Sequence, residues 1–231
     1  MKRVLLKLSG EALAGTKGTG FDLGTVEMVA DQIAKLHEKG LELGIVIGGG
    51  NFWRGRSGNE IDRTKSDQIG MLATVMNSIY VSDVVRTHGI ITSVMTPFEC
   101  GSITKLFSKD RANKYFSKGI VPFFAGGTGH PYFSTDTGAV LRAVEIEADA
   151  LLLAKAVDGV YSGDPKTDKT AVRYDEISLD EVIEKGLKVV DMTASILARE
   201  NHLAMRVFAL NEKDSIVRAV EGEFKGTIVT A

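Results

Sequence analysis

The chain has 231 residues, of which 44% are hydrophobic and 25% charged, and its 28 basic and 30 acidic side chains give a formal net charge of −2. This composition is ordinary for a globular protein and shows neither the basic excess of a nucleic-acid binder nor a charged tail. The single cysteine, Cys100, excludes an intramolecular disulfide, and no apolar run reaches the roughly 18 residues that cross a membrane. The four histidines show no zinc-binding spacing. We therefore expect a cytoplasmic protein without a structural metal.

Short apolar runs alternate with helix-length segments along the first two thirds of the chain. Helices are predicted where apolar side chains recur every three or four residues, as in the segment 26–39. In chain order we predict strand 4–8, helix 26–39, strand 43–47, helix 67–87, strand 90–95, a mainly helical segment 103–117, strand 120–124, helix 137–147 and strand 150–153. This alternation indicates an α/β fold, a three-layer αβα sandwich around a mainly parallel open sheet.

The pattern changes after residue 153. Hairpin and turn chemistry is expected at 157–161 and 162–165, followed by short helices at 177–185 and 194–200 and strands at 204–210 and 227–230. No linker or repeat interrupts the chain. We therefore predict a single domain over 1–231, with an amino-terminal lobe at about 1–150 and a carboxyl-terminal lobe at about 151–231.

Four glycine-bearing turns follow predicted strands, at residues 9–10, 48–50, 126–129 and 159–163. Glycine lets backbone amides approach an anion closely, and the carboxyl ends of parallel strands share one edge of a sheet. The four turns together predict a phosphate-binding crevice, although any one of them alone is also explained as a tight strand-to-helix connection. Neither the P-loop pattern nor the three-glycine dinucleotide pattern occurs, so nucleotide binding would use another class of site.

Three basic residues stand next to these turns. Lys7 ends the first strand, Arg54 follows the second glycine turn, and Lys155 ends the strand before the hairpin. Phosphoryl transfer needs positive charge on the transferring group and on the leaving oxygen, which such cations supply. The alternative for each is a solvated surface charge.

The segment 128–136 is the densest polar loop, with a glycine, two aromatic rings, three hydroxyls and a carboxylate. Rings and hydroxyls before a helix suit a base and a phosphate, while His130 is more typical of an ordinary loop residue. Two carboxylates have a second interpretation, because Asp67 and Asp136 each stand where they would cap a helix.

The motifs, taken in order, resemble those of the bacterial UMP kinases in the amino acid kinase superfamily. The similarity extends over essentially the whole chain and includes KLSGEAL at 7–13, IGGGN at 47–51, Arg54 with Gly55, Asp67, GMLATVMN at 70–77, the loop 128–136, EIEAD at 145–149 and VDGVY at 157–161. The resemblance implies transfer of the γ-phosphoryl group of ATP to UMP, with Mg²⁺ carried by ATP, in de novo pyrimidine nucleotide synthesis. It also implies a homohexamer, activation by GTP and inhibition by UTP.

The same resemblance assigns residues to each ligand. It implies catalytic roles for Lys7, Arg54 and Asp136, and ATP contacts with Lys7, Leu8, Ser9, Gly10, Gly50, Arg54, Lys155, Tyr161 and Asp164. For UMP it implies contacts with Gly49, Asp67, Thr128, Gly129, His130, Pro131, Tyr132, Phe133, Ser134 and Thr135. For GTP it implies a site over Gly15, Thr16, Lys17, Gly18, Thr19 and Gly20.

Because the phosphate of UMP is already ionised at neutral pH, the reaction needs positioning and charge neutralisation rather than a general base. Many members of the family carry a lysine directly before the VDGV motif, where this chain has Ala156 preceded by Lys155, so the cation that serves the leaving phosphate stays open. Two other functions also stay open: an amino acid kinase with a carboxylate or carbamate acceptor, and a non-catalytic nucleotide-binding storage or regulatory protein.

Overall fold

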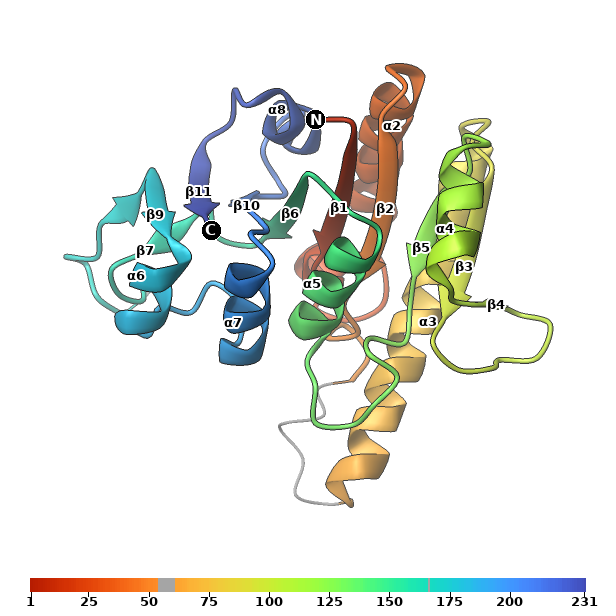
Figure 1. The fold of residues 1–231 in the computed structure, drawn as a ribbon, viewed down its shortest axis with the longest axis horizontal. Helices are drawn as coiled ribbons and strands as arrows, with labels where there is room; N and C mark the ends of the chain where they lie inside the picture. Colours follow the sequence, from red (N-terminus) through yellow and green to blue (C-terminus); the bar gives the residue numbers. More distant parts are fainter. Residues whose placement is uncertain (54–60, 166) are drawn as a thin grey trace.

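The computed structural model describes residues 1–53, 61–165 and 167–231. Within them, nine strands form one sheet across the molecule (Figure 1). In sheet order the strands are β4 (Lys105–Leu106), β3 (Thr92–Thr96), β5 (Val121–Phe124), β2 (Glu42–Ile47), β1 (Arg3–Leu8), β6 (Ala150–Lys155), β10 (Met205–Ala209), β11 (Gly226–Thr230) and β9 (Glu176–Ser178). Among the described strand pairs of this sheet, only β10–β11 is antiparallel, which confirms the predicted α/β architecture.

Helices cover both faces of this sheet, as Figure 1 shows. One hydrophobic core lies under α1 (Gly10–Ala14), α2 (Leu23–Glu38), α3 (Arg63–Thr87) and α8 (Ser215–Glu221). The other lies under α4 (Lys109–Phe116), α5 (Thr135–Glu145), α6 (Leu179–Glu184) and α7 (Met192–Glu200). A 3₁₀ turn, η1 (Gly15–Lys17), follows α1, and a separate antiparallel pair consists of β7 (Val160–Tyr161) and β8 (Arg173–Tyr174).

The alternation of side chains along β1 and β6 decides where their lysines point. Leu6 and Leu8 belong to the core under α2, whereas Leu5 belongs to the core under α5. Because successive side chains of a strand point to opposite faces, Lys7 shares the face of Leu5. Lys155 shares that face as well, because it follows Leu153 of the α5 core by two residues. Both lysines therefore point toward the layer that contains α5.

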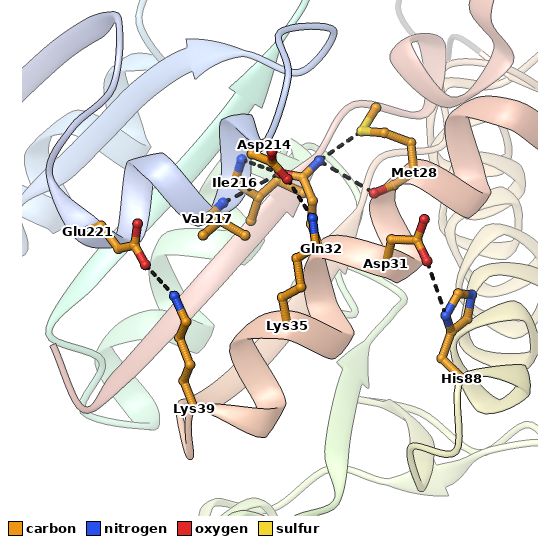
Figure 2. A network of polar contacts seen from close by, with 10 residues as sticks. All are labelled: Met28, Asp31, Gln32, Lys35, Lys39, His88, Asp214, Ile216, Val217 and Glu221. Atoms are coloured by element: carbon orange, nitrogen blue, oxygen red, sulfur yellow. Dashed lines mark hydrogen bonds and ion pairs between the residues drawn. The ribbon is translucent and has the colours of Figure 1, made fainter.

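A buried glutamine joins α2 to α8 on the opposite face (Figure 2). Gln32, 2% exposed, accepts hydrogen bonds at Oε1 from the backbone N–H groups of Ile216 at 2.8 Å and Val217 at 3.4 Å. The first turn of a helix leaves such donors without partners inside the helix. Asp214, at the N-cap of α8, has no side-chain capping bond and instead pairs with Lys35 at 2.7 Å. A side chain of α2 thus replaces the usual N-cap of α8.

Some predicted boundaries were wrong. In the segment 103–117, predicted to be mainly helical, α4 covers only Lys109–Phe116. Before it, β4 pairs with β3, and the helix begins after Ser108, whose hydroxyl accepts from Arg111 N. The helix predicted over 177–185 loses its first residues to β9, which pairs with β11. Helix α3 begins at Arg63 rather than at residue 67. Helices α1 and α8 were not predicted. No described helix is both long and apolar enough to cross a membrane.

Candidate active site

The end of β1 meets the start of α5 at an ion pair. Lys7 Nζ lies 2.8 Å from Asp136 Oδ1, and the two side chains are only 11% and 21% exposed. Asp136 does not cap α5, since the N-cap is Ser134, whose hydroxyl accepts from Thr137 N at 3.1 Å. The capping alternative for Asp136 was therefore wrong. Its carboxylate lies in the first helical turn, where the positive end of the helix dipole favours a negative charge.

A second lysine joins this pair from the neighbouring strand. Lys155 Nζ donates a hydrogen bond to the carbonyl oxygen of Val189. Burial lowers the pKa of Lys155, the charge of Lys7 lowers it further, and the carboxylate of Asp136 opposes that lowering. The three groups are thus close enough to influence one another electrostatically. The sheet edge gathers two cations around one carboxylate, which is an arrangement suited to polyanionic phosphates.

Two glycine turns pack against each other beside the ion pair. A Cβ atom on Gly10 would lie 2.4 Å from the carbonyl oxygen of Gly48, so only glycine permits this approach. Buried Asn77 of α3 donates from Nδ2 to that same oxygen at 2.6 Å and to Asn51 Oδ1 at 2.7 Å. Asn51 in turn donates to the carbonyl oxygen of Gly20 at 2.8 Å. The paired asparagines thus connect the turn after β2 to α3 and to the segment 15–20.

A cavity of about 370 Å³ opens next to these turns. Its lining comes from the turn after β2, the first half of α3 and the loop before α5: Gly49, Gly50, Trp53, Arg63, Asp67, Gly70, Met71, Thr74, Gly127, Thr128, His130, Phe133, Ser134 and Thr135. Thr74 Oγ1 accepts from Gly126 N at 2.8 Å, which ties α3 to the loop across the cavity. Seven of the residues assigned to UMP from the sequence lie together here: Gly49, Asp67, Thr128, His130, Phe133, Ser134 and Thr135.

Asp67 lies inside α3 and does not cap it. The N-cap is Asp62, whose side chain accepts from Lys65 N at 3.2 Å, so the capping alternative for Asp67 was wrong. Asp67 Oδ2 accepts from Arg63 Nε at 2.8 Å and from the backbone N–H of Tyr132 at 2.8 Å. A carboxylate of the cavity wall is therefore held by both the helix and the loop that enclose the cavity.

A second cavity, of about 400 Å³, is lined by the β7 region and the segment after α6, and it includes Tyr161 and Asp164. The Tyr161 hydroxyl donates to Asp158 Oδ1 at 2.6 Å, and this bond, together with Lys225 at 2.9 Å from Oδ2, lowers the pKa of Asp158 to about 2. Arg173 of β8 pairs with the same carboxylate at 3.2 Å. Asp158 therefore fixes the tyrosine ring at this cavity.

The remaining predicted residues are placed less directly. Leu8 is fully buried in the core, so only its backbone is near the site. Gly129, Pro131 and Tyr132 belong to the loop but not to the cavity lining. Arg54 lies outside the described residues. Of the segment 15–20, Gly15 and Thr16 line a third cavity with Lys155, and the Thr19 hydroxyl donates to Asn51 O at 2.8 Å.

Sequence reasoning assigned no site role to five other residues that line the cavity beside the glycine turns: Trp53, Arg63, Gly70, Met71 and Thr74. The only tryptophan of the chain gave a usable signal, because a single Trp beside a glycine turn stands out, and its Nε1 donates to Ser66 Oγ at 3.0 Å. Arg63 gave none, since an arginine in the first turn of a polar helix resembles a solvated surface charge. The described part of the chain brings no three His, Cys, Asp or Glu side chains together as a metal-binding group.

Comparison with known proteins agrees with this geometry. Residues 2–209 match the model of the amino acid kinase family. The chain is 37% identical to the UMP kinase of Bacillus anthracis, with a TM-score of 0.94 over 99% of this chain and 96% of that one. It is 35% identical to the UMP kinase of Ureaplasma parvum, with a TM-score of 0.94 over 100% and 99%. The uridylate kinase of Archaeoglobus fulgidus matches at 27% identity and a TM-score of 0.77 over 99% and 100%.

The sheet, the paired glycine turns and the lysine–carboxylate pair define a phosphotransferase fold, and the chain belongs to the amino acid kinase family. Within that family it is similar along its whole length to the solved bacterial UMP kinases.

Proposed function

We propose that this protein is a UMP kinase, which transfers the γ-phosphoryl group of ATP to UMP and yields ADP and UDP in pyrimidine nucleotide synthesis. The observation that carries the proposal is the continuity between the acceptor cavity and the ion pair. Ser134 and Thr135 line the cavity, and the next residue, Asp136, holds Lys7 at 2.8 Å. An acceptor phosphate in this cavity would therefore lie beside the charged groups that phosphoryl transfer needs.

We assign each of the predicted site residues a role in this chemistry. Lys7 neutralises charge on the transferring phosphoryl group, and Arg54 supplies further phosphate charge. Asp136 orients the lysine. Ser9, Gly10 and Gly50 present backbone groups to the ATP phosphates, and Tyr161 and Asp164 adjoin its ribose and base. Lys155, with its pKa lowered by burial beside Asp136, is the cation nearest to the position where the family carries its lysine, and we assign it to the leaving phosphate.

Magnesium fits this site as an ion that arrives with ATP. Asp136 offers a carboxylate at this site, and Mg²⁺ prefers a few carboxylate and phosphate oxygens together with several waters. When bound together with ATP, the ion would neutralise charge that develops on the phosphates. Asp136 would orient its water shell.

Regulation and assembly belong to the same proposal. GTP as activator would act through the segment 15–20, which Thr19 and Gly20 join to the phosphate turn by way of Asn51, and UTP would act as inhibitor. The protein would assemble as a homohexamer, and the exposed apolar stripe of α3 supports a subunit interface there: Ile69 is 40%, Leu72 52% and Met76 49% exposed at helical spacing. We assign the acceptor to the lobe of residues 1–150 and ATP to the lobe of residues 151–231.

A coupled assay of ADP release tests the function. The acceptors are UMP, CMP, AMP, GMP, N-acetylglutamate, aspartate and carbamate, each at saturating ATP and Mg²⁺. We expect UMP to be preferred by at least about two orders of magnitude in kcat/KM, because unmatched buried polar groups penalise the wrong base and Thr128 is the candidate that contacts the pyrimidine edge. Preference for a carboxylate or carbamate would assign the chain to another branch of the family. Binding of nucleotides without any turnover would indicate a storage or regulatory protein.

A further inference from the structure

Arg63 joins the two walls of the acceptor cavity. It is the first residue of α3, and its Nε donates to Asp67 Oδ2 at 2.8 Å, one turn further along the helix. Its guanidinium carbon lies 5.3 Å from the centre of the Tyr132 ring, within the range of a cation–π contact. The backbone N–H of Tyr132 donates to the same Asp67 oxygen. Arg63 therefore contacts the carboxylate of the helix and the aromatic residue of the loop.

Arg63 also compensates the negative charge of Asp67 in the cavity. Among the described residues that line the cavity, Arg63 is the only lysine or arginine and Asp67 the only carboxylate. An acceptor with an ionised phosphate would be repelled by an uncompensated carboxylate in the same partly enclosed space. The side chain of Asp67 is only 13% exposed, so water screens its charge weakly. Arg63 cancels that charge and lets a carboxylate face an anionic ligand.

The two hydrogen bonds also fix the direction of the carboxylate. Both the Arg63 bond and the Tyr132 bond end on Oδ2, and no bond between described side chains ends on Oδ1. A carboxylate with one oxygen held by two donors points its second oxygen in a set direction. Tyr132 contributes to this arrangement at the cost of a left-handed backbone, with φ of 73°, which is uncommon outside glycine. Such a conformation persists where neighbouring contacts hold it.

We propose that Arg63 is a positioning residue that orients Asp67 toward a ribose hydroxyl of the acceptor and so determines how strictly the enzyme requires that hydroxyl. The inference rests on the proposed function and deepens it, because it concerns the sugar of the same acceptor. Arginine suits the role better than lysine. Its planar group donates from Nε in a defined direction while it lies over an aromatic ring, whereas an ammonium is a flexible point charge.

The test compares UMP with 2′-deoxy-UMP and 3′-deoxy-UMP as acceptors for the wild type, Arg63→Ala, Arg63→Lys and the control Lys65→Ala. Lys65 is an exposed lysine of the same helical turn and is not part of the cavity lining. In Arg63→Ala we expect kcat/KM for UMP to fall about tenfold, as for loss of a charge-assisted contact. For the deoxy analogue that lacks the hydroxyl contacted by Asp67 in UMP, the fall should be clearly smaller, because only the compensation of the carboxylate charge is lost. The preference for the hydroxyl thus shrinks, while the KM for ATP and the Tm stay near wild type.

Arg63→Lys should recover part of the UMP affinity through its charge but not the preference for the hydroxyl. The double variant with Arg63→Ala and Asp67→Asn should lose little more kcat/KM for UMP than the single variant Asp67→Asn, because Arg63 acts through that carboxylate. Equal losses for UMP and both deoxy analogues, or full recovery of the preference by lysine, would overturn the inference and leave Arg63 as a general charge. A lowered Tm with a parallel rise in the KM for ATP would mean that Arg63 has only a structural role. A wild type that does not phosphorylate UMP would overturn the proposed function together with this inference, whereas an active wild type with an unchanged ratio in Arg63→Ala overturns this inference alone.

Discussion

Lys7 Nζ lies 2.8 Å from Asp136 Oδ1, and this contact joins the end of a central strand to the first turn of a helix that covers the sheet. The lysine is largely buried and shares its face of β1 with Leu5. A buried ammonium needs a partner, and the carboxylate supplies one while leaving the other protons of the lysine for a ligand. Asp136 therefore keeps the charged ammonium group of Lys7 in place at the sheet edge.

Replacement of Lys7 by alanine tests that role. In Lys7→Ala we expect kcat to fall by about two to four orders of magnitude, equivalent to roughly 3–5 kcal/mol of lost transition-state stabilisation. Steady-state kinetics at saturating ATP and UMP measure the effect, and Lys118→Ala, at an exposed lysine after α4, serves as the control. A folded Lys7→Ala protein with the kcat of the wild type would remove Lys7 from the mechanism.

Asp67 gives a second test. In Asp67→Asn we expect the KM for UMP to rise by a factor that corresponds to about 1–3 kcal/mol, because a charged acceptor for the ribose is lost. The KM for ATP should move less. The matched control is Asp62→Asn at the N-cap of α3, where asparagine caps nearly as well as aspartate and neither stability nor KM should change. An unchanged KM for UMP in Asp67→Asn would refute contact between this carboxylate and the acceptor.

Replacement of Gln32 tests the hydrogen bonds between α2 and α8 that Figure 2 shows. In Gln32→Ala the backbone donors of Ile216 and Val217 lose their acceptor in a buried setting, and we expect a loss of about 1–3 kcal/mol in the free energy of unfolding. The control Lys35→Ala removes an exposed ion pair to Asp214, which water and salt screen, and it should destabilise the protein less than Gln32→Ala does. Urea unfolding measures both. Equal stabilities of the two variants would mean that these donors do not depend on Gln32.

The lowered pKa of Asp158 predicts that the stability of the fold depends on pH. Its pKa is lowered from 3.8 to about 2, first by the Tyr161 hydroxyl and then by Lys225. Because the folded pKa lies below the ordinary value, this carboxylate stabilises the fold above about pH 4, and its contribution is lost as the pH falls from about 4 toward 2. The group is partly exposed, so we expect about 1–2 kcal/mol.

Urea unfolding of the wild type and Asp158→Asn at pH 6, 4 and 3 measures this contribution. The gap between the two proteins should be widest at pH 6 and should narrow as the pH falls. A gap that stays constant over this range would show that Asp158 has an ordinary pKa in the folded protein.

Local sequence patterns predicted most of the strands and the glycine turns, because the period of a strand or helix and the conformational freedom of glycine act over a few neighbouring residues. They failed where pairing over long distances decided the outcome. The residues after position 103 form β4 because β3 lies beside them, and β9 takes the start of a predicted helix because β11 provides a partner. Asp67 resembled an N-cap only because the start of α3, four residues earlier, lacks an apolar pattern.

The sequence by itself determined the class of the fold, the place of Lys7 at a strand end and the polar loop that leads to Asp136, since each depends on residues close in the chain. Only the tertiary structure decided which groups meet. The side-chain alternation of β1 and the packing of α5 bring Lys7 to Asp136, and the approach of the loop to α3 joins Tyr132, Arg63 and Asp67. Such contacts depend on strand register and on how layers pack, and no local pattern encodes the distance between segments far apart in the chain.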